Sequence, residues 1–358
     1  MKYSTQLTLT VLLYTLAGLA CASCQTTVTG STAGAGGTAG AGGTGGAGAV
    51  GVVLDVDATL LLEEGLYAEV TTETCTLSSG TVSTCYRITT STIPVEHDIG
   101  PFCPRHIDDE SDVSGIWFEG GEIYDADGAF IQDLATFYDD PTWQLYDPST
   151  GEVYVTDTQA ACEAAARPDV DPAYQNYCVE CDVSYAGADT IGTYVIPVTP
   201  VRSATSTSLG MNVVGLALNG VNFDPPAPTD AILSNYTIAA LDDCGGHVNP
   251  VTGYHYHAAT GCHETVAQED AHAPLIGYAL DGHGIYALNG EDGAEPEDLD
   301  ACRGHEDAVR GYHYHVASAG ENLLVGCFNG EHGCHFEGAS EEPCDATQSA
   351  GLPPGPPG

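Results

Sequence analysis

Apolar and polar residues alternate along several stretches near the start of the chain, and many of the apolar ones are β-branched. This pattern is typical of strands with one buried face. Cys75 and Cys85 flank Ser79-Gly80, which suits a tight turn, so a hairpin closed by a disulfide is expected there. The predicted strands are residues 50–62, 67–76 and 81–92.

A different pattern predicts a helix over residues 158–166. These residues are rich in Ala, Gln and Glu, which favour helices, and Arg167-Pro168 ends the run. Another short motif, Asp125-Ala126-Asp127-Gly128, resembles the start of a calcium loop. The later ligands of such a loop are missing, so a hairpin turn is expected at this position instead.

The sequence between residues 211 and 330 contains one pattern twice, at about 211–265 and 274–330. Each copy has a turn-forming pair, Asn219-Gly220 or Asp281-Gly282, followed by a block of the form Cys-x-Gly-His-x5-Gly-Tyr-His-Tyr-His. The two blocks have identical spacing and run from Cys244 to His257 and from Cys302 to His315. One more cysteine follows each block, so the expected disulfides are Cys244–Cys262 and Cys302–Cys327.

Together these patterns predict a mainly β fold. We expect a pseudo-symmetric duplicated β-rich domain, sandwich- or barrel-like, with one or two short helices and disulfide cross-links, because each copy alone is too small to bury a core. The predicted limits are an export signal at 1–24, a linker rich in Gly, Ala and Thr at 25–49, the domain at 50–338 and a flexible tail at 339–358.

The cysteines and the first residues both indicate export. Residues 7–20 are mostly apolar and are followed by small residues, which is the layout of a signal peptide, and no later run is long enough to span a bilayer. Attachment of a lipid to Cys21 or Cys24 is an alternative ending of this signal. Without these two, an even number of the 14 cysteines remains, as expected for disulfides in an oxidising compartment. The predicted location is extracytoplasmic, either secreted or attached to the cell surface or outer membrane.

The net charge restricts the partners. Seven basic residues oppose 50 acidic ones, for a formal net charge of −43. Such a chain repels nucleic acid and anionic membranes and attracts cations. A metal cation is therefore an expected partner, and nucleic acid is not.

The repeated Tyr-His-Tyr-His segments are the strongest candidates for chemistry. In a strand, His255 and His257 point to one face with backbones about 6.6 Å apart, so both rings can reach one ion. His247 is the third candidate ligand, and three imidazoles suit zinc or copper with a position left open. The second copy repeats the set as His305, His313 and His315. The six histidines form either two sites or one shared cleft.

Other interpretations of these residues stay open. The histidines can be hydrogen-bonded core residues, or they can form acid–base pairs oriented by Asp242 or Asp300. His332 and His335 form a further small cluster around Cys334, which binds metal or pairs with Cys344. Cys178 and Cys181 have the spacing of a redox pair, although a structural role is expected among so many exported cysteines.

Taken together, the motifs resemble the YHYH-domain family of exported proteins. The resemblance covers roughly residues 90–330 and includes Ile93-Pro94-Val95-Glu96-His97, residues 196–200, 217–221 and 274–286, and both blocks that end in Tyr-His-Tyr-His. It implies export and one domain architecture, and it names no reaction. It adds His97 as a further candidate ligand; Asp281 and His283 are weaker ones.

Three classes of function follow from these observations. The first is an exported protein that binds zinc or copper through the duplicated histidine segments. The second is a metal-dependent enzyme, a hydrolase or an oxidoreductase, with the histidines as its active site. The third is an acidic, surface-attached adhesive or matrix protein in which the histidines are structural. The sequence indicates no particular substrate.

Overall fold

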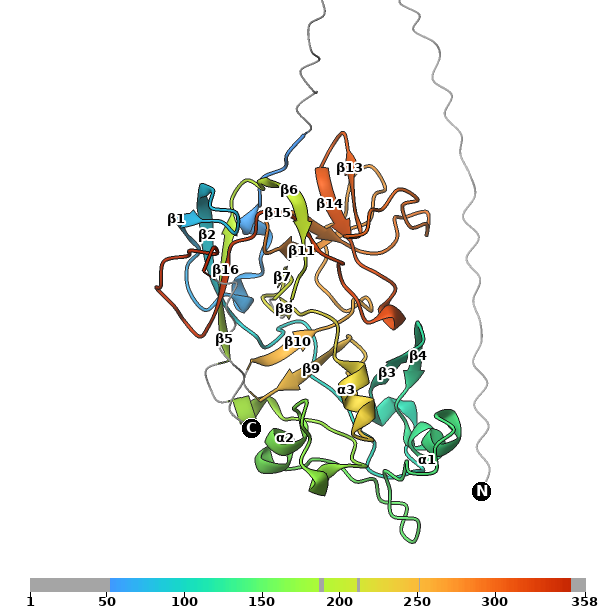
Figure 1. The fold of residues 1–358 in the computed structure, drawn as a ribbon. Coiled ribbons are helices and arrows are strands. Elements are labelled where there is room, and N and C mark those ends of the chain that lie inside the picture. Colours follow the sequence, from blue (N-terminus) through green and yellow to red (C-terminus); the bar gives the residue numbers. More distant parts are fainter. Residues whose placement is uncertain (1–51, 187–189, 211–212, 251, 349–358) are drawn as a thin grey trace, which may run out of the picture. The chain divides into compact units, whose positions relative to one another are not determined.

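The structure, a computed structural model, describes residues 52–186, 190–210, 213–250 and 252–348. Over these residues the chain is mainly β, as the sequence predicts (Figure 1). The predicted signal at 1–24, the linker at 25–49 and the last part of the tail lie outside the described residues. Among the residues that are described, no helix has the length and apolar character that crossing a bilayer requires.

An open eight-stranded sheet carries both copies of the repeated sequence. Its order is β13-β14-β12-β11-β7-β8-β10-β9, with β13 and β9 at the edges, so it does not close into a barrel. The strands are β7 (Gly215–Ala217), β8 (Asn222–Phe223), β9 (Gly246–Asn249), β10 (Gly253–Tyr256), β11 (Leu275–Ala279), β12 (Gly284–Tyr286), β13 (Gly304–Asp307) and β14 (Gly311–His315).

The two halves of this sheet have the same topology. In each half an antiparallel pair, β7–β8 or β11–β12, is followed by a parallel pair, β8–β10 or β12–β14. An antiparallel hairpin, β9–β10 or β13–β14, then ends the half. Strands β7 and β11 pair antiparallel at the centre and join the halves. Corresponding residues of the two repeated segments therefore occupy corresponding places in the sheet.

Tight turns connect the first two strands of each half, as predicted from Asn219-Gly220 and Asp281-Gly282. Gly220 has φ +92° and Gly282 has φ +85°. Side chains rarely adopt this left-handed conformation, and glycine does so without a steric penalty. The repeated glycine is thus explained by the turn.

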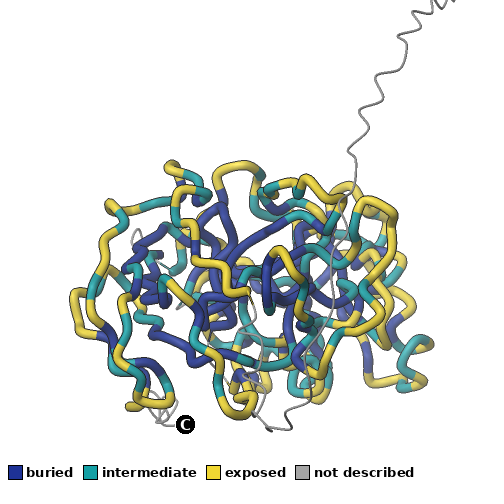
Figure 2. Tube along the Cα trace, turned by 90° about the horizontal axis from the view of Figure 1, so that it is seen from above, coloured by how far each residue is buried: buried dark blue, intermediate teal, exposed yellow. Residues whose placement is uncertain are grey.

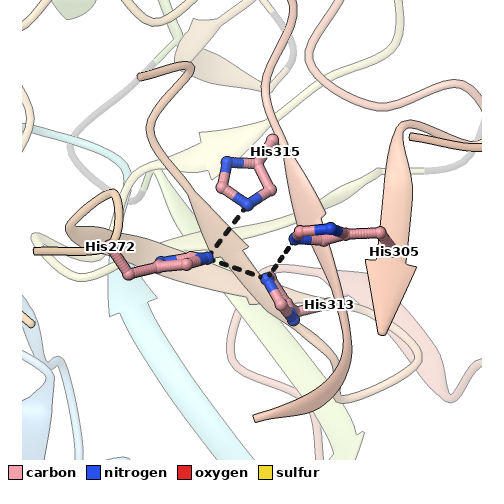
Figure 3. A group of neighbouring side chains, drawn as sticks. All are labelled: His272, His305, His313 and His315. Carbon is pink, nitrogen blue, oxygen red and sulfur yellow. Dashed lines mark hydrogen bonds between the residues drawn. The ribbon is translucent and has the colours of Figure 1, made fainter. Parts of the chain in front are cut away.

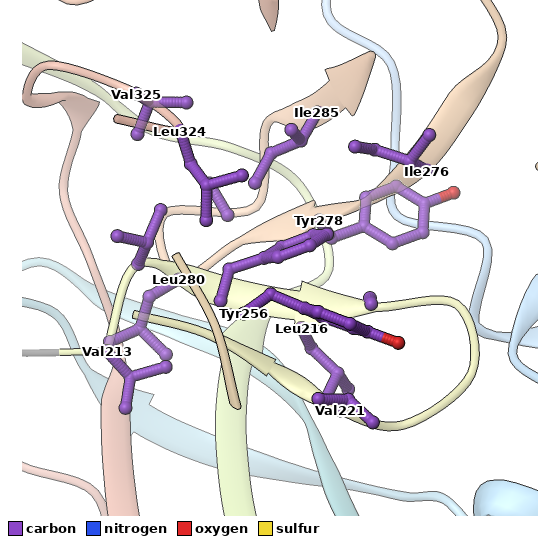
Figure 4. Close-up of a cluster of buried hydrophobic side chains, with 14 of the residues drawn as sticks. Val213, Leu216, Val221, Tyr256, Ile276, Tyr278, Leu280, Ile285, Leu324 and Val325 are labelled. Atoms are coloured by element: carbon purple, nitrogen blue, oxygen red, sulfur yellow. The ribbon is translucent and has the colours of Figure 1, made fainter. Parts of the chain in front are cut away.

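The tyrosines of the repeated segments fill the core on the face of the sheet opposite the histidines. Tyr254, Tyr256 and Tyr314 are among the largest fully buried side chains. Their hydroxyls are hydrogen-bonded: Tyr254 donates to Asp242 at 2.9 Å and Tyr314 to Asp281 at 2.6 Å. Figure 4 shows Tyr256 and Tyr278 packed among aliphatic side chains of the largest core cluster. Alternation along the strand thus separates a packing face from a histidine face.

A glycine before the first histidine of each block makes room for a tyrosine ring. A Cβ on Gly246 would lie 2.4 Å from the ring and hydroxyl of Tyr254, and one on Gly304 would lie 2.2 Å from the hydroxyl of Tyr312. We therefore expect Gly246→Ala to destabilise the fold by about 1–3 kcal/mol through overpacking. Urea unfolding measures this, with Gly261→Ala, which faces open space but also has a positive φ, as a comparison. Equal midpoints for Gly246→Ala and the wild type would contradict this expectation.

Three smaller sheets surround the large one. Their orders are β1-β2-β5-β16, β15-β6 and β3-β4. Their strands are β1 (Thr71–Thr76), β2 (Val82–Ser91), β3 (Ile116–Glu119), β4 (Glu122–Asp125), β5 (Ile191–Pro197), β6 (Arg202–Thr207), β15 (Phe328–Gly330) and β16 (Cys334–Glu337). Strands β1 and β2 confirm two predicted strands and the hairpin between them.

The predicted strand at 50–62 is wrong over its described part, 52–62. A short 3₁₀ turn, Ala58–Leu60, forms there, because Asp57 accepts a hydrogen bond from the backbone N–H of Thr59 at 3.0 Å. An aspartate that caps a turn competes with strand pairing. The alternation of apolar residues did not reveal this local effect.

Three α-helices occur among the described residues, rather than the expected one or two: α1 (Gly128–Phe137), α2 (Gln159–Ala165) and α3 (Thr229–Ser234). Helix α2 lies where it was predicted, and Thr158 caps it. The hairpin turn predicted at residues 125–128 is wrong. Asp127 instead accepts a hydrogen bond from the N–H of Phe130 at 2.8 Å and begins α1, a common role for aspartate.

Six disulfides cross-link the described residues. The two expected in the repeats, Cys244–Cys262 and Cys302–Cys327, are confirmed, as is the hairpin bridge Cys75–Cys85. Cys178 and Cys181 do not form a redox pair with each other. Each is bonded to a different cysteine, so the expected structural role is confirmed. The other bridges are Cys103–Cys178, Cys162–Cys181 and Cys334–Cys344.

The folded chain continues past residue 338, the predicted end of the domain. Asp345 bridges to Thr76, and Ala346 is buried. Cys344 is bonded to Cys334, which ties residues 339–348 to the four-stranded sheet. The first half of the predicted tail therefore belongs to the fold. Figure 2 shows buried segments running through the interior and exposed ones in the outer loops.

Candidate metal centres

Three histidines of the second copy and His272, which precedes that copy, meet at one point (Figure 3). His305 lies on β13, His313 and His315 lie on β14, and His272 precedes β11. The Nε2 atom of His313 is 3.0 Å from those of His272 and His305, and Nε2 of His315 is 3.2 Å from Nε2 of His272. Each residue offers one nitrogen, and all four nitrogens lie within 4.8 Å of one another. We call this group the four-histidine cluster.

Three histidines of the first copy form a second group. Nε2 of His257 lies 3.1 Å from Nε2 of His255 and 3.2 Å from Nε2 of His247. His255 and His257 are buried, and His247 is half-buried. We call this group the three-histidine cluster. No residue belongs to both groups, so within the described residues the six predicted histidines do not converge on a shared cleft.

The hairpin register explains how the spacing in the sequence produces these groups. His247 on β9 is directly opposite His255 on β10, and His305 on β13 is directly opposite His313 on β14. Opposite residues of an antiparallel pair point to the same face. The histidine two residues further along shares that face as well. The eight-position separation between the first histidine of each block and the first histidine of its Tyr-His-Tyr-His segment therefore brings three imidazoles together.

The other ring nitrogen of six of these histidines is already hydrogen-bonded. Five Nδ1 atoms face backbone carbonyls and one faces a carboxylate, and these oxygens can only accept, so the proton lies on Nδ1. The partners are Gly253 O for His255 (3.1 Å), Pro225 O for His257 (2.6 Å), Ala273 O for His272 (2.9 Å), Asp298 Oδ1 for His305 (2.7 Å), Gly311 O for His313 (2.9 Å) and Ala287 O for His315 (2.9 Å).

Burial keeps several of the rings neutral. Desolvation lowers the pKa of His313 to about 4 and that of His315 to about 3. It also lowers the pKa of His257 to about 4, and burial together with the neighbouring His255 and His257 lowers the pKa of His247 well below its usual value. A neutral ring with its proton on Nδ1 has a lone pair on Nε2.

In the four-histidine cluster, and between His255 and His257, these lone pairs face one another without a proton between them. Such an arrangement is repulsive by itself and becomes favourable around a cation. Four nitrogens placed tetrahedrally around an ion at about 2.0–2.1 Å would lie about 3.3 Å apart. The shortest separations, 3.0–3.2 Å, are close to that value, and the remaining pairs lie within 4.8 Å. In metalloproteins the ring nitrogen that does not bind the metal usually donates to a carbonyl or carboxylate oxygen, which orients the ring. The oxygens that accept from Nδ1 here match that arrangement.

His272 is the member that the sequence reasoning missed. It lies in the segment before β11, and its place in the first copy has no histidine, so comparing the copies gave no signal. The remaining hint was its position two residues before the Pro274-Leu275 motif of the family resemblance. Only the fold shows that this segment lies beside β14.

Arg310 holds the segment that carries His272. Its buried guanidinium pairs with Asp270 and Asp307 and lies 5.8 Å from the ring centre of Tyr286. We expect Arg310→Ala to weaken metal binding at the four-histidine cluster by about 10–100-fold, the usual effect of losing an outer-shell partner. Arg310→Lys should restore part of the affinity. Lysine keeps the positive charge but lacks the planar guanidinium that pairs with both carboxylates. Chelator competition measures both, and an unchanged affinity in Arg310→Ala would contradict this role.

The three weaker candidates lie outside both clusters. His97 Nε2 is 2.7 Å from the hydroxyl of Tyr256. Asp281 is fully buried and accepts hydrogen bonds from Tyr314 and the backbone N–H of Gly330. His283 lies edge-on to the ring of Tyr312, with ring centres 5.0 Å apart. All three contact the tyrosine side of the strands, so in the structure they are placed as packing residues.

Two further readings of the sequence are not supported. Asp242 and Asp300 orient the hydroxyls of Tyr254 and Tyr312 and not an imidazole, which removes the basis for acid–base pairs. Cys334 is bonded to Cys344, and the histidines on either side of it are in neither cluster of the described residues.

The structure thus defines a disulfide-linked β protein with two histidine clusters that could each hold a metal ion. Residues 193–298 match the family model described as YHYH protein, which supports the resemblance that the motifs indicate. The match includes all of the three-histidine cluster and His272 and ends before His305. No curated protein and no solved structure matches the chain.

Proposed function

We propose that this protein binds transition-metal ions, one at each histidine cluster. The observation that carries the proposal is the orientation of the rings. Six of the seven Nδ1 atoms donate to backbone or carboxylate oxygens, while Nε2 atoms of neighbouring rings face one another at 3.0–3.2 Å. A cluster of structural histidines would be expected to satisfy its nitrogens with protein partners instead, as His97 does with Tyr256.

Ligand type favours zinc or copper. Imidazole nitrogen suits both ions, whereas calcium and magnesium prefer oxygen. The formal charge of −43 raises the local concentration of cations around the molecule and so supports loading. The family match and the disulfides are consistent with a protein outside the cytoplasm, and we propose that it binds its metal there, secreted or attached to the surface.

Metal analysis of the purified protein tests the proposal. The protein is treated with a chelator, dialysed against Zn²⁺ or Cu²⁺, freed of excess ion and analysed for metal per chain. Two equivalents are expected from two clusters. No bound metal after this reconstitution would overturn the proposal and favour a matrix protein with structural histidines.

A metal-dependent enzyme is the second candidate function. The observation that favours it applies to one cluster only: a cavity of about 300 Å³ is lined in part by His247, His255 and His257. An enzyme needs a metal position that a substrate can reach, whereas simple binding does not.

A further inference from the structure

The two clusters differ at one equivalent position of the sheet. Phe223 pairs with Tyr256 in the first copy, and Ile285 pairs with Tyr314 in the second. The next residue is Asp224 in one case and Tyr286 in the other. The same backbone site therefore presents a small carboxylate beside the three-histidine cluster and a large ring beside the four-histidine cluster.

The four-histidine cluster is closed. His272 supplies a fourth nitrogen, and the ring of Tyr286 covers the group, with its centre 4.8 Å from that of His272 and 5.0 Å from that of His313. Four imidazoles complete the tetrahedral shell that zinc takes in structural sites. An ion held there has no free position for a further ligand.

The three-histidine cluster, in contrast, opens into the cavity of about 300 Å³. Asp224 also lines this cavity. Its Oδ2 atom is 3.8 Å from Nε2 of His255, and Asn222 donates to its other carboxylate oxygen at 2.5 Å. Three nitrogen ligands leave one coordination position of a four-coordinate ion open. This open position can face the cavity.

Most of the cavity wall is apolar. Helices α2 and α3, the segment after α2, and the strand residue Val248 contribute to it. The apolar lining includes Ala165, Val170, Val179, Ala231, Ile232 and Val248. A cavity of this size is at the lower end of those that hold small ligands. Its charged lining residues are Arg167, Glu180 and Asp224.

We propose that the three-histidine cluster holds its ion with an open position, and that the cavity takes a small molecule with an anionic oxygen-donor head and an apolar body. The head binds the ion, and the body lies against α2 and α3. This inference rests on the proposed metal binding and adds the class of ligand. It also assigns different roles to the two copies: the four-histidine cluster is saturated and stabilising, and the three-histidine cluster is open.

Cobalt and two hydroxamates test this directly. The full-length protein is loaded with Co²⁺, whose visible absorption reports its ligands, and titrated with octanohydroxamate or acetohydroxamate. Both carry the same metal-binding head, and only the first has a hydrocarbon tail. We expect octanohydroxamate to change the spectrum of one of two bound cobalt ions and to bind at least about ten-fold more tightly than acetohydroxamate, because the apolar wall covers its tail.

Variants locate the response. Ala231→Phe fills the cavity from α3 and should lower the affinity for octanohydroxamate at least about ten-fold, without changing the cobalt content or the affinity for acetohydroxamate. Ile232→Ser, which makes the wall polar, is the second variant and should act in the same direction. His255→Ala/His257→Ala should abolish the response, and His313→Ala/His315→Ala should retain it.

The outcomes separate this inference from the proposed function. If two cobalt ions bind and neither hydroxamate changes the spectrum, the open site is refuted while metal binding stands. Equal affinities for the two hydroxamates would refute the apolar body of the ligand. A response that survives His255→Ala/His257→Ala would place the open site elsewhere. If the chain retains no cobalt, the proposed function itself fails.

Discussion

Replacing His313 and His315 together by Ala is expected to lower the metal content from two equivalents per chain to one. These rings supply two of the four nitrogens of the cluster, and both are almost fully buried. The variant leaves His272 and His305 with no third ligand. We expect the affinity of this site to fall by more than about 100-fold, beyond the effect of losing an outer-shell partner alone.

Elemental analysis after dialysis measures the loss, and two variants control it. His255→Ala/His257→Ala should remove the other equivalent and leave the four-histidine cluster loaded. His332→Ala removes a buried histidine that belongs to neither cluster, so the protein should keep both ions. Two equivalents in both double variants would show that the clusters are not the metal sites.

Replacing Asp281 by Ala is expected to destabilise the protein by about 3 kcal/mol or more without removing a metal ligand. Asp281 lies in the turn between β11 and β12, is completely buried and contacts strand β15. It accepts hydrogen bonds from the hydroxyl of Tyr314 at 2.6 Å and from the N–H of Gly330 at 2.9 Å. Its other oxygen accepts from the N–H of His283 at 3.2 Å. Removing the carboxylate leaves these donors without their acceptor, and each buried unpaired donor costs about 1–3 kcal/mol.

Urea unfolding of the metal-loaded protein gives the size of this effect. Asp281→Asn keeps the shape and one carbonyl acceptor, so it should cost less than Asp281→Ala. Metal content, measured below the unfolding transition, should equal that of the wild type in both variants. Loss of one equivalent with an unchanged unfolding midpoint would instead assign Asp281 to a metal site.

The contrast between Asp281 and His272 shows how far comparison of the repeats could go. Asp281 follows a matched run of residues and was a candidate ligand, yet it serves the tyrosine face. His272 has no counterpart in the first copy, yet it completes the second cluster. Repetition identified the hairpins and their disulfides reliably because both depend on residues close in sequence. It could not identify a ligand that a single copy supplies from a distant segment.

Local spacing is what the sequence determined by itself. The separation of eight positions from His247 to His255, and from His305 to His313, fixes a hairpin register that puts the imidazoles on one face. The bridges Cys244–Cys262 and Cys302–Cys327 join the cysteine of each block to the next cysteine along the chain. These features depend on strand periodicity and short loops, and both can be read along the chain.

Tertiary structure alone decided how the two clusters differ. His272 and Tyr286 close one of them, and the packing of α2 and α3 leaves a cavity beside the other. These contacts join segments that are far apart in sequence, and no periodicity encodes which of them will meet. The six histidines of the repeated blocks are placed by local spacing, whereas the fourth histidine of one cluster and the space beside the other depend on packing between distant segments.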